Sequence, residues 1–278
     1  MSQRPRFVSE ALVAHLFQIG AGSGGIAVLD LLARDQRITR VTLVEPDVYA
    51  VHNVYRHLFP PSAVGRLKAE LAAEWVRAIR PDIACAAIVA DITDPARQGE
   101  FASFAAECDF GVCAADNESA KFAFDALMRA AGKPWTLGEV LSGGIGGWVH
   151  RFAPGAACYG CVASHLKREV IEQPSGPPPD YSNPAAAQPE ATIPASKASI
   201  AVIAAMHALV TLDCRDDFTS LLFSLQTVPS VFDTAFRAHR LSVPRSPTCL
   251  TCGTANPTPT GEQLDAAVDD ALARLGAR

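Results

Sequence analysis

The sequence lacks the long hydrophobic runs and the excess of basic charge that would direct a chain to a membrane or to nucleic acid. No uninterrupted apolar stretch approaches the roughly 20 residues that a helix needs to cross a bilayer. Acidic residues outnumber basic ones by 29 to 24, so there is no positive field for a polyanion or an anionic lipid surface. The N-terminal stretch MSQRPRFVSEALVAHLF carries too many charges for a secretory signal. We therefore expect a cytoplasmic protein that meets any bound anion through a local site.

Cysteine is absent from residues 170–197, although this stretch contains seven prolines. It is too long and irregular for an ordinary connection within a compact domain, which predicts a mobile crossover or lid. Four of the eight cysteines form two CxxC pairs, and Cys85, Cys108, Cys113 and Cys214 lie scattered in or near apolar segments. This usage favours reduced thiols and a bound metal over disulfides. There is no internal repeat.

The first half of the chain alternates between strand and helix patterns. Strands are expected at 12–19, 40–47, 84–91 and 108–116, and helices at 26–35, 65–80, 95–107 and 118–132. Repeated βα units predict an α/β fold with a Rossmann-like, mostly parallel sheet. From residue 133 the pattern becomes richer in β-formers and glycine, which predicts mixed or antiparallel strands, followed by helices at 198–212 and 261–278. We expect a single domain over 1–278, with a nucleotide-binding half at about 1–135 and a mixed-sheet half at about 136–278.

Gly20, Gly22 and Gly25 match G-x-G-x-x-G between the first predicted strand and helix. Missing side chains at these positions let the backbone turn sharply and approach a phosphate at a helix N-terminus. Glu45 closes the next strand 25 residues after Gly20, where an acidic side chain accepts hydrogen bonds from ribose hydroxyls. A purely structural glycine turn is the alternative, but this context favours nucleotide binding.

A polar segment follows Glu45 and indicates which nucleotide is bound. Asn53, Arg56 and Lys68 can supply donors and positive charge to a β,γ-pyrophosphate, a set that an NAD(P) oxidoreductase does not generally need. The alternative is that these are ordinary polar residues on the protein surface, an interpretation that would be preferred for a lone arginine. Asp116, at the end of the fourth predicted strand, either holds Mg²⁺ or shares the capping of the next helix with Asn117.

The order of these motifs resembles the superfamily of ubiquitin-like-modifier activating enzymes, comprising the ThiF, MoeB and HesA proteins and the adenylation halves of eukaryotic ubiquitin activators. The resemblance covers most of the chain and follows the family's order. The matching segments are GAGSGG, VEPDVYAVHNVYRH, VGRLKAE, IRPDI, AADNESAKFAFDALMRAAGKP and GGIGGWVHRFAPGAACYGC.

The resemblance implies ATP-dependent adenylation of the C-terminal carboxylate of a ubiquitin-like or sulfur-carrier protein that ends in glycine. The products would be an acyl-adenylate and pyrophosphate. It also implies a homodimer and, in some branches, a conjugating enzyme as a further partner. The residues that it assigns are Glu45 and Asp47 to the nucleotide, with Glu45 on the ribose, Asn53, Arg56 and Lys68 to the phosphates, and Asp116 to Mg²⁺.

Several residues depart from the family pattern. Glu45 replaces the commoner Asp, His57 stands where the family often has Gln, and Lys121 replaces an Arg, keeping the charge without the bidentate fork. An arginine that reaches across the family dimer has Arg4 or Arg6 as its candidates. Among the histidines, His52 and His57 flank the phosphate segment and are expected to assist binding, whereas His15, His150 and His207 are expected in the core or an interface.

The two CxxC pairs, Cys158 with Cys161 and Cys249 with Cys252, supply four thiolates despite the 87 residues between them. Together with a family that often holds zinc there, they predict one structural tetrahedral zinc site, with a redox dithiol as the alternative. A thioester-forming activator also needs a nucleophilic cysteine. Cys214 is the remaining cysteine of the second half, and it is either that nucleophile or an inert small hydrophobe.

Three alternatives to this function stay open at the level of sequence. The same fold could adenylate a peptide or a tRNA-linked carboxylate. The protein could also be a non-catalytic scaffold subunit or an NAD(P) oxidoreductase. The polar residues Asn53, Arg56 and Lys68 argue against these two alternatives.

Overall fold

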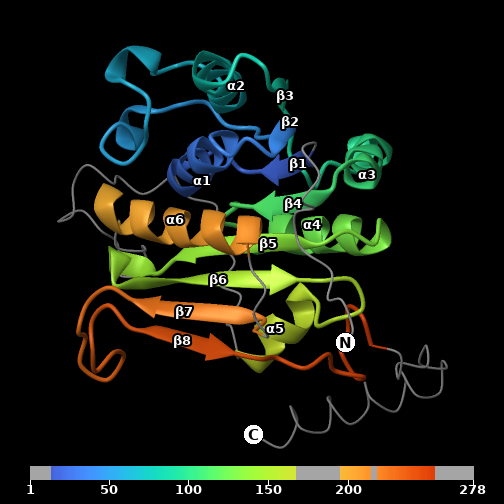
Figure 1. Ribbon diagram of the computed structural model, residues 1–278, viewed down its shortest axis with the longest axis vertical. Helices are drawn as coiled ribbons and strands as arrows, with labels where there is room; N and C mark the ends of the chain where they lie inside the picture. Colours follow the sequence, from blue (N-terminus) through green and yellow to red (C-terminus); the bar gives the residue numbers. More distant parts are fainter. Residues whose placement is uncertain (1–13, 167–194, 214–217, 254–278) are drawn as a thin grey trace, which may run out of the picture.

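The computed structural model describes residues 14–166, 195–213 and 218–253. In this part of the chain eight strands form one sheet, in the order β3-β2-β1-β4-β5-β6-β7-β8 (Figure 1). The strands are β1 (Ala14–Ile19), β2 (Ile38–Val44), β3 (Ala84–Ile88), β4 (Phe110–Cys113), β5 (Trp135–Val140), β6 (Gly146–Phe152), β7 (Ser220–Ser224) and β8 (Ala238–Leu241).

The sheet changes character where the sequence pattern does. Strands β3, β2, β1, β4 and β5 are parallel, and β6, β7 and β8 continue the sheet in antiparallel pairs. This confirms the predicted fold class of a mostly parallel α/β sheet with mixed C-terminal strands. Because β5 pairs with both β4 and β6, the sheet runs through both predicted halves of the chain.

The register of the parallel strands aligns their carboxyl ends. Ile19 of β1 lies opposite Val44 of β2 and Cys113 of β4, and Val44 lies opposite Ile88 of β3. The segments that follow these four strands therefore leave the sheet side by side. In open α/β sheets this edge is where ligands bind.

Helices cover both faces of the sheet. On one face α1 (Ser23–Ala33), α2 (Lys68–Ile79) and α6 (Lys197–Asp213) pack together, with α6 over β5 and β6 (Figure 1). On the other lie α3 (Gln98–Glu107), α4 (Glu118–Ala130) and α5 (Tyr159–His165). The 3₁₀ turns are η1 (Val51–Asn53), η2 (Pro61–Ala63), η3 (Pro95–Arg97) and η4 (Ser142–Gly144).

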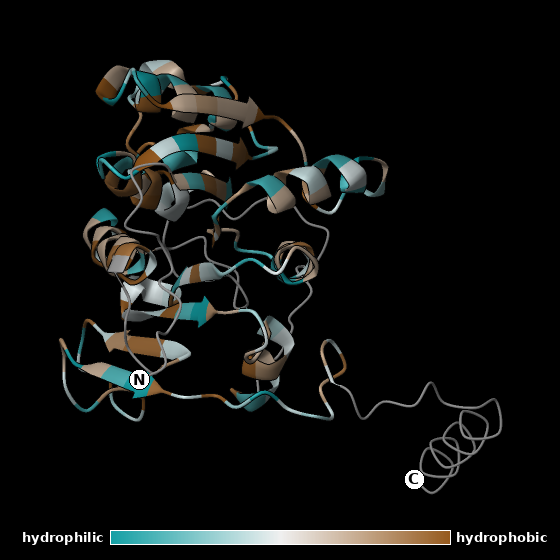
Figure 2. Cartoon of the chain, turned by 45° about the vertical axis from the view of Figure 1, so that its right-hand side comes forward, coloured by the Kyte–Doolittle hydropathy of each residue, from teal (hydrophilic) through white to brown (hydrophobic). Residues whose placement is uncertain are grey.

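Each helical layer has its own apolar core. Leu16, Ile26 and Leu29 are fully buried between the sheet and α1, α2 and α6. On the opposite face the buried Trp135 ring stacks on Phe152 at 4.1 Å and meets Phe124 edge to face. Figure 2 shows the apolar residues running along the strands that these layers cover.

Two details differ from the sequence expectations. The fourth strand ends at Cys113, so Asp116 lies three residues beyond it rather than at its last position. The first helix begins at Ser23, directly on the glycine loop, three residues earlier than its apolar pattern suggests.

Most of the predicted crossover (170–197) and the whole predicted helix at 261–278 lie outside the described residues. In the part of the chain that the structure describes, no helix combines the length and apolar character needed to cross a membrane.

Candidate functional site

The glycine loop closes β1 onto α1 because two of its glycines leave no room for a side chain. Gly20 has φ +87°, and a Cβ there would lie 2.7 Å from the Ala114 carbonyl. A Cβ on Gly25 would overlap the Gly20 carbonyl. A Cβ on Gly22 would meet no atom within 4 Å, so this glycine faces open space. The first and last glycines thus serve packing, and the middle one leaves the backbone accessible to a ligand.

The N-terminus of α1 offers backbone donors at this loop. Its N-cap residue is Gly22, which has no side chain to satisfy the first N–H groups of the helix, and the first turn contains no acidic residue. Such a helix end attracts anions through its free N–H groups and its dipole. From below, the buried Gln18 amide donates to the Gly20 and Gly25 carbonyls, each at 2.9 Å, and so fixes both ends of the loop.

Glu45 fastens the end of β2 to the glycine loop. One carboxylate oxygen accepts a hydrogen bond from the backbone N–H of Ala21, and the other accepts from Asp47 N at 2.9 Å. Burial raises the pKa of Glu45, while the backbone donors and Lys68 act in the opposite direction. The role predicted for Glu45 on a ribose remains a prediction.

His57 also forms a hydrogen bond with the glycine loop. Its side chain is 1% exposed and its Nε2 lies 3.0 Å from the Ala21 carbonyl. Because a carbonyl only accepts, the imidazole donates through Nε2. Burial lowers the pKa of His57 to about 4, so the ring is neutral at physiological pH. His57 therefore holds the loop rather than facing a ligand, whereas His52 does line the cavity described next.

A cavity of about 760 Å³ opens at the carboxyl edge of the parallel strands. Ligand sites of 300 to 1,000 Å³ are typical of proteins. The lining of the cavity includes all of the residues predicted to bind the nucleotide except Gly25. The predicted residues that line it are Gly20, Gly22, Glu45, Asp47, Asn53, Arg56, Lys68 and Asp116.

The cationic and amide groups of the cavity come from the segment after β2 and the start of α2. Lys68 begins α2, and its amine donates to the Asp47 carboxylate at 2.7 Å, which holds a buried lysine in place. Asn53 Oδ1 accepts from Ala50 N at 2.9 Å and shapes the turn that presents Arg56. The cavity lining thus includes a lysine, an arginine and an amide as well as the glycine loop.

Asp116 lies between β4 and α4. Asn117 caps α4, since its Oδ1 accepts from Ala120 N at 2.8 Å. The capping alternative for Asp116 is therefore taken by its neighbour, and the exposed Asp116 carboxylate lines the cavity. Hard oxygen ligands of this kind suit Mg²⁺.

The cavity also has walls that the sequence reasoning missed. Glu139 lies near the carboxyl end of β5, Ser142 follows β5 and Asp91 follows β3, so the carboxyl-edge rule could have found all three. Lys121 donates to Glu118 and Glu139 at 2.7 Å each and is 4% exposed. Helix α6 supplies a further, mostly apolar wall, and no local sequence motif predicts it. Its residues are Ile200, Ile203, Ala204 and His207. His15, His150 and His207 are buried, as expected.

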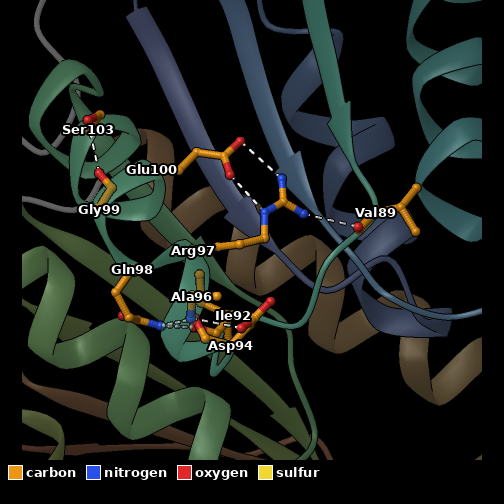
Figure 3. A network of polar contacts seen from close by, with 9 residues as sticks. All are labelled: Val89, Ile92, Asp94, Ala96, Arg97, Gln98, Gly99, Glu100 and Ser103. Carbon is orange, nitrogen blue, oxygen red and sulfur yellow. Dashed lines mark hydrogen bonds and ion pairs between the residues drawn. The ribbon is translucent and has the colours of Figure 1, made fainter.

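The turn after β3, whose residues 90–92 line one end of the cavity, is held from behind by the start of α3 (Figure 3). Arg97 donates to the Val89 carbonyl at 3.2 Å and pairs with Glu100. Gln98 donates to the carbonyls of Ile92 and Asp94 at 2.9 and 3.0 Å. These contacts make this wall a fixed surface.

Outside the cavity lining, the four CxxC cysteines meet in one buried cluster. Their sulfur atoms all lie within 4.8 Å of one another, and three pairs are separated by 3.8, 3.7 and 3.5 Å. A tetrahedral zinc with bonds of about 2.3 Å has sulfur–sulfur edges of about 3.8 Å. The backbone N–H of Ser246 also points to the Cys161 sulfur at 3.4 Å, as suits a thiolate. The cluster therefore fits a structural zinc ion.

The other thiols divide by burial. Cys108 and Cys113 are fully buried, and burial raises the pKa of each to about 12. Cys85 is half-buried, and its pKa is raised to about 11 for the same reason. None of these three thiols ionises readily near neutral pH. Cys214, Arg4 and Arg6 lie outside the described residues, so their predicted roles stay predictions.

The sheet, the glycine loop and the cavity define a protein of Rossmann-like fold with a four-cysteine cluster. Within that class the chain belongs to the ThiF family, whose model matches residues 8–251. The resemblance read from the sequence motifs is thereby confirmed.

The relatives in sequence are modifier-activating enzymes. Ubiquitin-like modifier-activating enzyme 5 of Drosophila virilis is 26% identical over 164 residues, which cover 56% of this chain and 41% of that protein. The protein of the same name from Rattus norvegicus is 23% identical over 169 residues, or 56% of this chain and 42% of that one. The matched region is thus about two fifths of the length of these relatives.

Solved structures of E. coli MccB share the fold. MccB alone superimposes with a TM-score of 0.65 at 18% identity, covering 86% of this chain and 65% of that one. MccB with ATP gives 0.61 at 17% identity, covering 89% and 68%. MccB with AMPCPP and MccA gives 0.63 at 18% identity, covering 86% and 66%.

Proposed function

We propose that this protein catalyses the ATP-dependent adenylation of the C-terminal carboxylate of a ubiquitin-like or sulfur-carrier protein. The observation that carries the proposal is the cavity whose lining includes Asn53, Arg56, Lys68 and Asp116 together with the glycine loop at the α1 N-terminus. Membership of the ThiF family and relatives named as modifier-activating enzymes support it.

In the proposed reaction, a carboxylate oxygen attacks the α-phosphate of ATP. A carboxylate–phosphorus bond forms as the bond between the α-phosphorus and the bridging oxygen breaks, and pyrophosphate leaves with the electron pair. The carboxylate is already ionised, so the step needs no general base. The demands on the protein are alignment of the two reactants and stabilisation of the charge that develops on the leaving group.

The cavity residues divide these tasks. The N–H groups of the glycine loop and the α1 terminus bind the phosphates, and Arg56 and Lys68 stabilise the departing pyrophosphate with Asn53 as a further donor. Glu45 accepts from ribose hydroxyls and Asp47 keeps Lys68 in place. Asp116 would hold Mg²⁺, which adds positive charge beside the phosphates.

The structural relative MccB, solved with ATP and with MccA, favours a second acceptor class, the carboxylate of a peptide. The two classes differ in size rather than in chemistry, since each presents a free carboxylate. Pyrophosphate exchange with ubiquitin-like proteins and with short peptides as alternative acceptors would separate them. A homodimer, a conjugating enzyme and a thioester on Cys214 also belong to the proposal, and intact mass after incubation with ATP and a modifier would reveal such an adduct.

The direct test is ATP–pyrophosphate exchange with purified full-length protein. Replacing Arg56 or Asp116 with Ala should lower exchange at least about 100-fold, since each residue contributes transition-state or metal charge. The zinc content should not change, because neither residue belongs to the cysteine cluster. Arg77→Ala, an exposed arginine on α2, is the matched control and should keep full exchange. Full exchange in both site variants would contradict the assignment.

A further inference from the structure

A chain of hydrogen bonds leads from the cysteine cluster to the cavity, beginning at Tyr159. This residue lies between the ligand positions Cys158 and Cys161 and is fully buried. Its backbone N–H donates to Asp125 Oδ1 at 3.0 Å, and its hydroxyl donates to Glu118 Oε2 at 2.6 Å. Helix α5 is therefore fastened to α4 at two points, and one of them is the first residue of α4.

The chain continues through a buried lysine. The second oxygen of Glu118 accepts from Lys121 Nζ at 2.7 Å, and Lys121 also donates to Glu139 Oε1 of β5 at 2.7 Å. Glu139 Oε2 lies 3.1 Å from His150 Nε2, and His150 Nδ1 lies 2.8 Å from Ser220 Oγ. One set of contacts thus joins α5, α4, β5, β6 and β7.

Three features make this chain more than generic packing. Lys121 is 4% exposed and bears a charge that needs both carboxylates, so its position depends on theirs. Lys121 and Glu139 both line the cavity. Glu118 lies two residues after Asp116, the predicted Mg²⁺ ligand. A shift of α5 would therefore reach the cavity wall through short, charged hydrogen bonds.

We propose that Tyr159 and Glu118 are positioning residues that couple the cysteine cluster, when it holds zinc, to Mg-ATP binding at the N-terminal end of α4. The inference rests on the proposed function, since it names how that same site is held. Coupling of this kind is reciprocal: zinc strengthens Mg-ATP binding, and Mg-ATP strengthens zinc retention by the same factor.

The test compares wild-type holoprotein with Tyr159→Phe, which removes the hydroxyl but keeps the ring contacts with Phe122 and Phe152. We expect the KM for ATP in pyrophosphate exchange to rise about 5-fold or more, with a smaller change in kcat and one zinc per chain retained. In wild type, Mg-ATP should slow zinc extraction by a chromogenic chelator, and in Tyr159→Phe this protection should disappear. Ser224→Ala, which removes another buried hydroxyl that donates at 2.6 Å, should keep both properties.

Glu118→Gln provides a second variant outside the cluster, in case Tyr159→Phe fails to fold or loses zinc. It should show the same loss of protection, because the amide replaces one of the two accepting oxygens with an NH2 group and removes the charge that pairs with Lys121. Wild-type KM and protection in either folded variant would overturn the coupling and leave the proposed function standing. Absence of exchange in wild type with every acceptor would overturn the proposed function and the coupling together.

Discussion

At the scale of single residues, the side chains around the cavity work largely by holding backbone in place. Gln18, Glu45 and His57 each bond to the glycine loop, and all three are buried. His57 occupies a position where the family often has glutamine. Both side chains can donate one N–H to the Ala21 carbonyl, so the exchange preserves the contact that matters.

His57 makes a prediction about pH. Its pKa is about 4 in the folded protein and about 6.5 in an exposed chain, so between these values the unfolded state binds a proton that the folded state does not. The stability that depends on neutral His57 is fully present above about pH 6.5 and is lost as the pH falls toward 4. His57→Gln should therefore reduce the loss of stability between about pH 7 and about pH 4.5 by up to about 3 kcal/mol.

Urea denaturation at the two pH values measures this difference. His165→Gln removes an exposed histidine from α5 and serves as the control, which should keep the wild-type dependence. An unchanged dependence in His57→Gln would show that its neutral, buried state is not what the structure indicates.

At the scale of elements, the glycine loop and α1 form one unit. The helix starts directly on the loop, and its first turn fits only because Gly25 lies against the Gly20 carbonyl. The neighbouring Gly24 is in the same turn, but a Cβ there would meet no atom within 4 Å. Adjacent glycines in one motif therefore have opposite tolerance to a methyl group.

Alanine at these two positions tests that difference. Gly25→Ala should lower the free energy of unfolding by about 1–3 kcal/mol, because the backbone of β1 and α1 must separate to admit the methyl group. Gly24→Ala should leave it within about 1 kcal/mol of wild type or raise it, since alanine is the better helix former. Urea denaturation without nucleotide gives both values. Equal losses in the two variants would contradict the packing described for Gly25.

At the scale of the whole molecule, two centres lie at different places on one continuous sheet. The cavity spans the ends of the parallel strands, and the cysteine cluster joins α5 to the segment after β8. Closing a loop of roughly 90 residues is worth about 4–5 kcal/mol in chain entropy alone. Zinc in the cluster is therefore expected to stabilise the antiparallel end of the sheet.

Removing one ligand tests this role. Cys249→Ser should lose the zinc and lower the free energy of unfolding by several kcal/mol, on the order of the 4–5 kcal/mol expected for the lost closure. Metal analysis and thermal denaturation measure the two effects. Cys85→Ser, a half-buried thiol outside the cluster, should keep its zinc. One zinc per chain in Cys249→Ser would show that the cluster is not the metal site.

The sequence by itself determined the parallel part of the fold, the glycine loop and the two CxxC pairs. These features depend on local patterns. They are strand and helix periodicity, a turn that tolerates only glycine, and two cysteine ligands separated by two residues in each CxxC pair. Most of the site residues proposed from the sequence line the cavity, whereas Asp91, Glu139 and the wall from α6 were not among them. The fit of the four thiols to one ion needed the structure, since 87 residues separate the pairs.

Only the tertiary structure decided what each polar side chain touches. Glu45 and His57 both bond to Ala21 from segments 24 and 36 residues away, and no periodicity encodes that distance. The same holds for the contact of Tyr159 with Glu118, 41 residues apart in the chain. Sequence patterns report which face of an element is buried, whereas hydrogen bonds between elements depend on how the faces are stacked. For that reason the site was predictable as a set of residues, and its internal bonding was not.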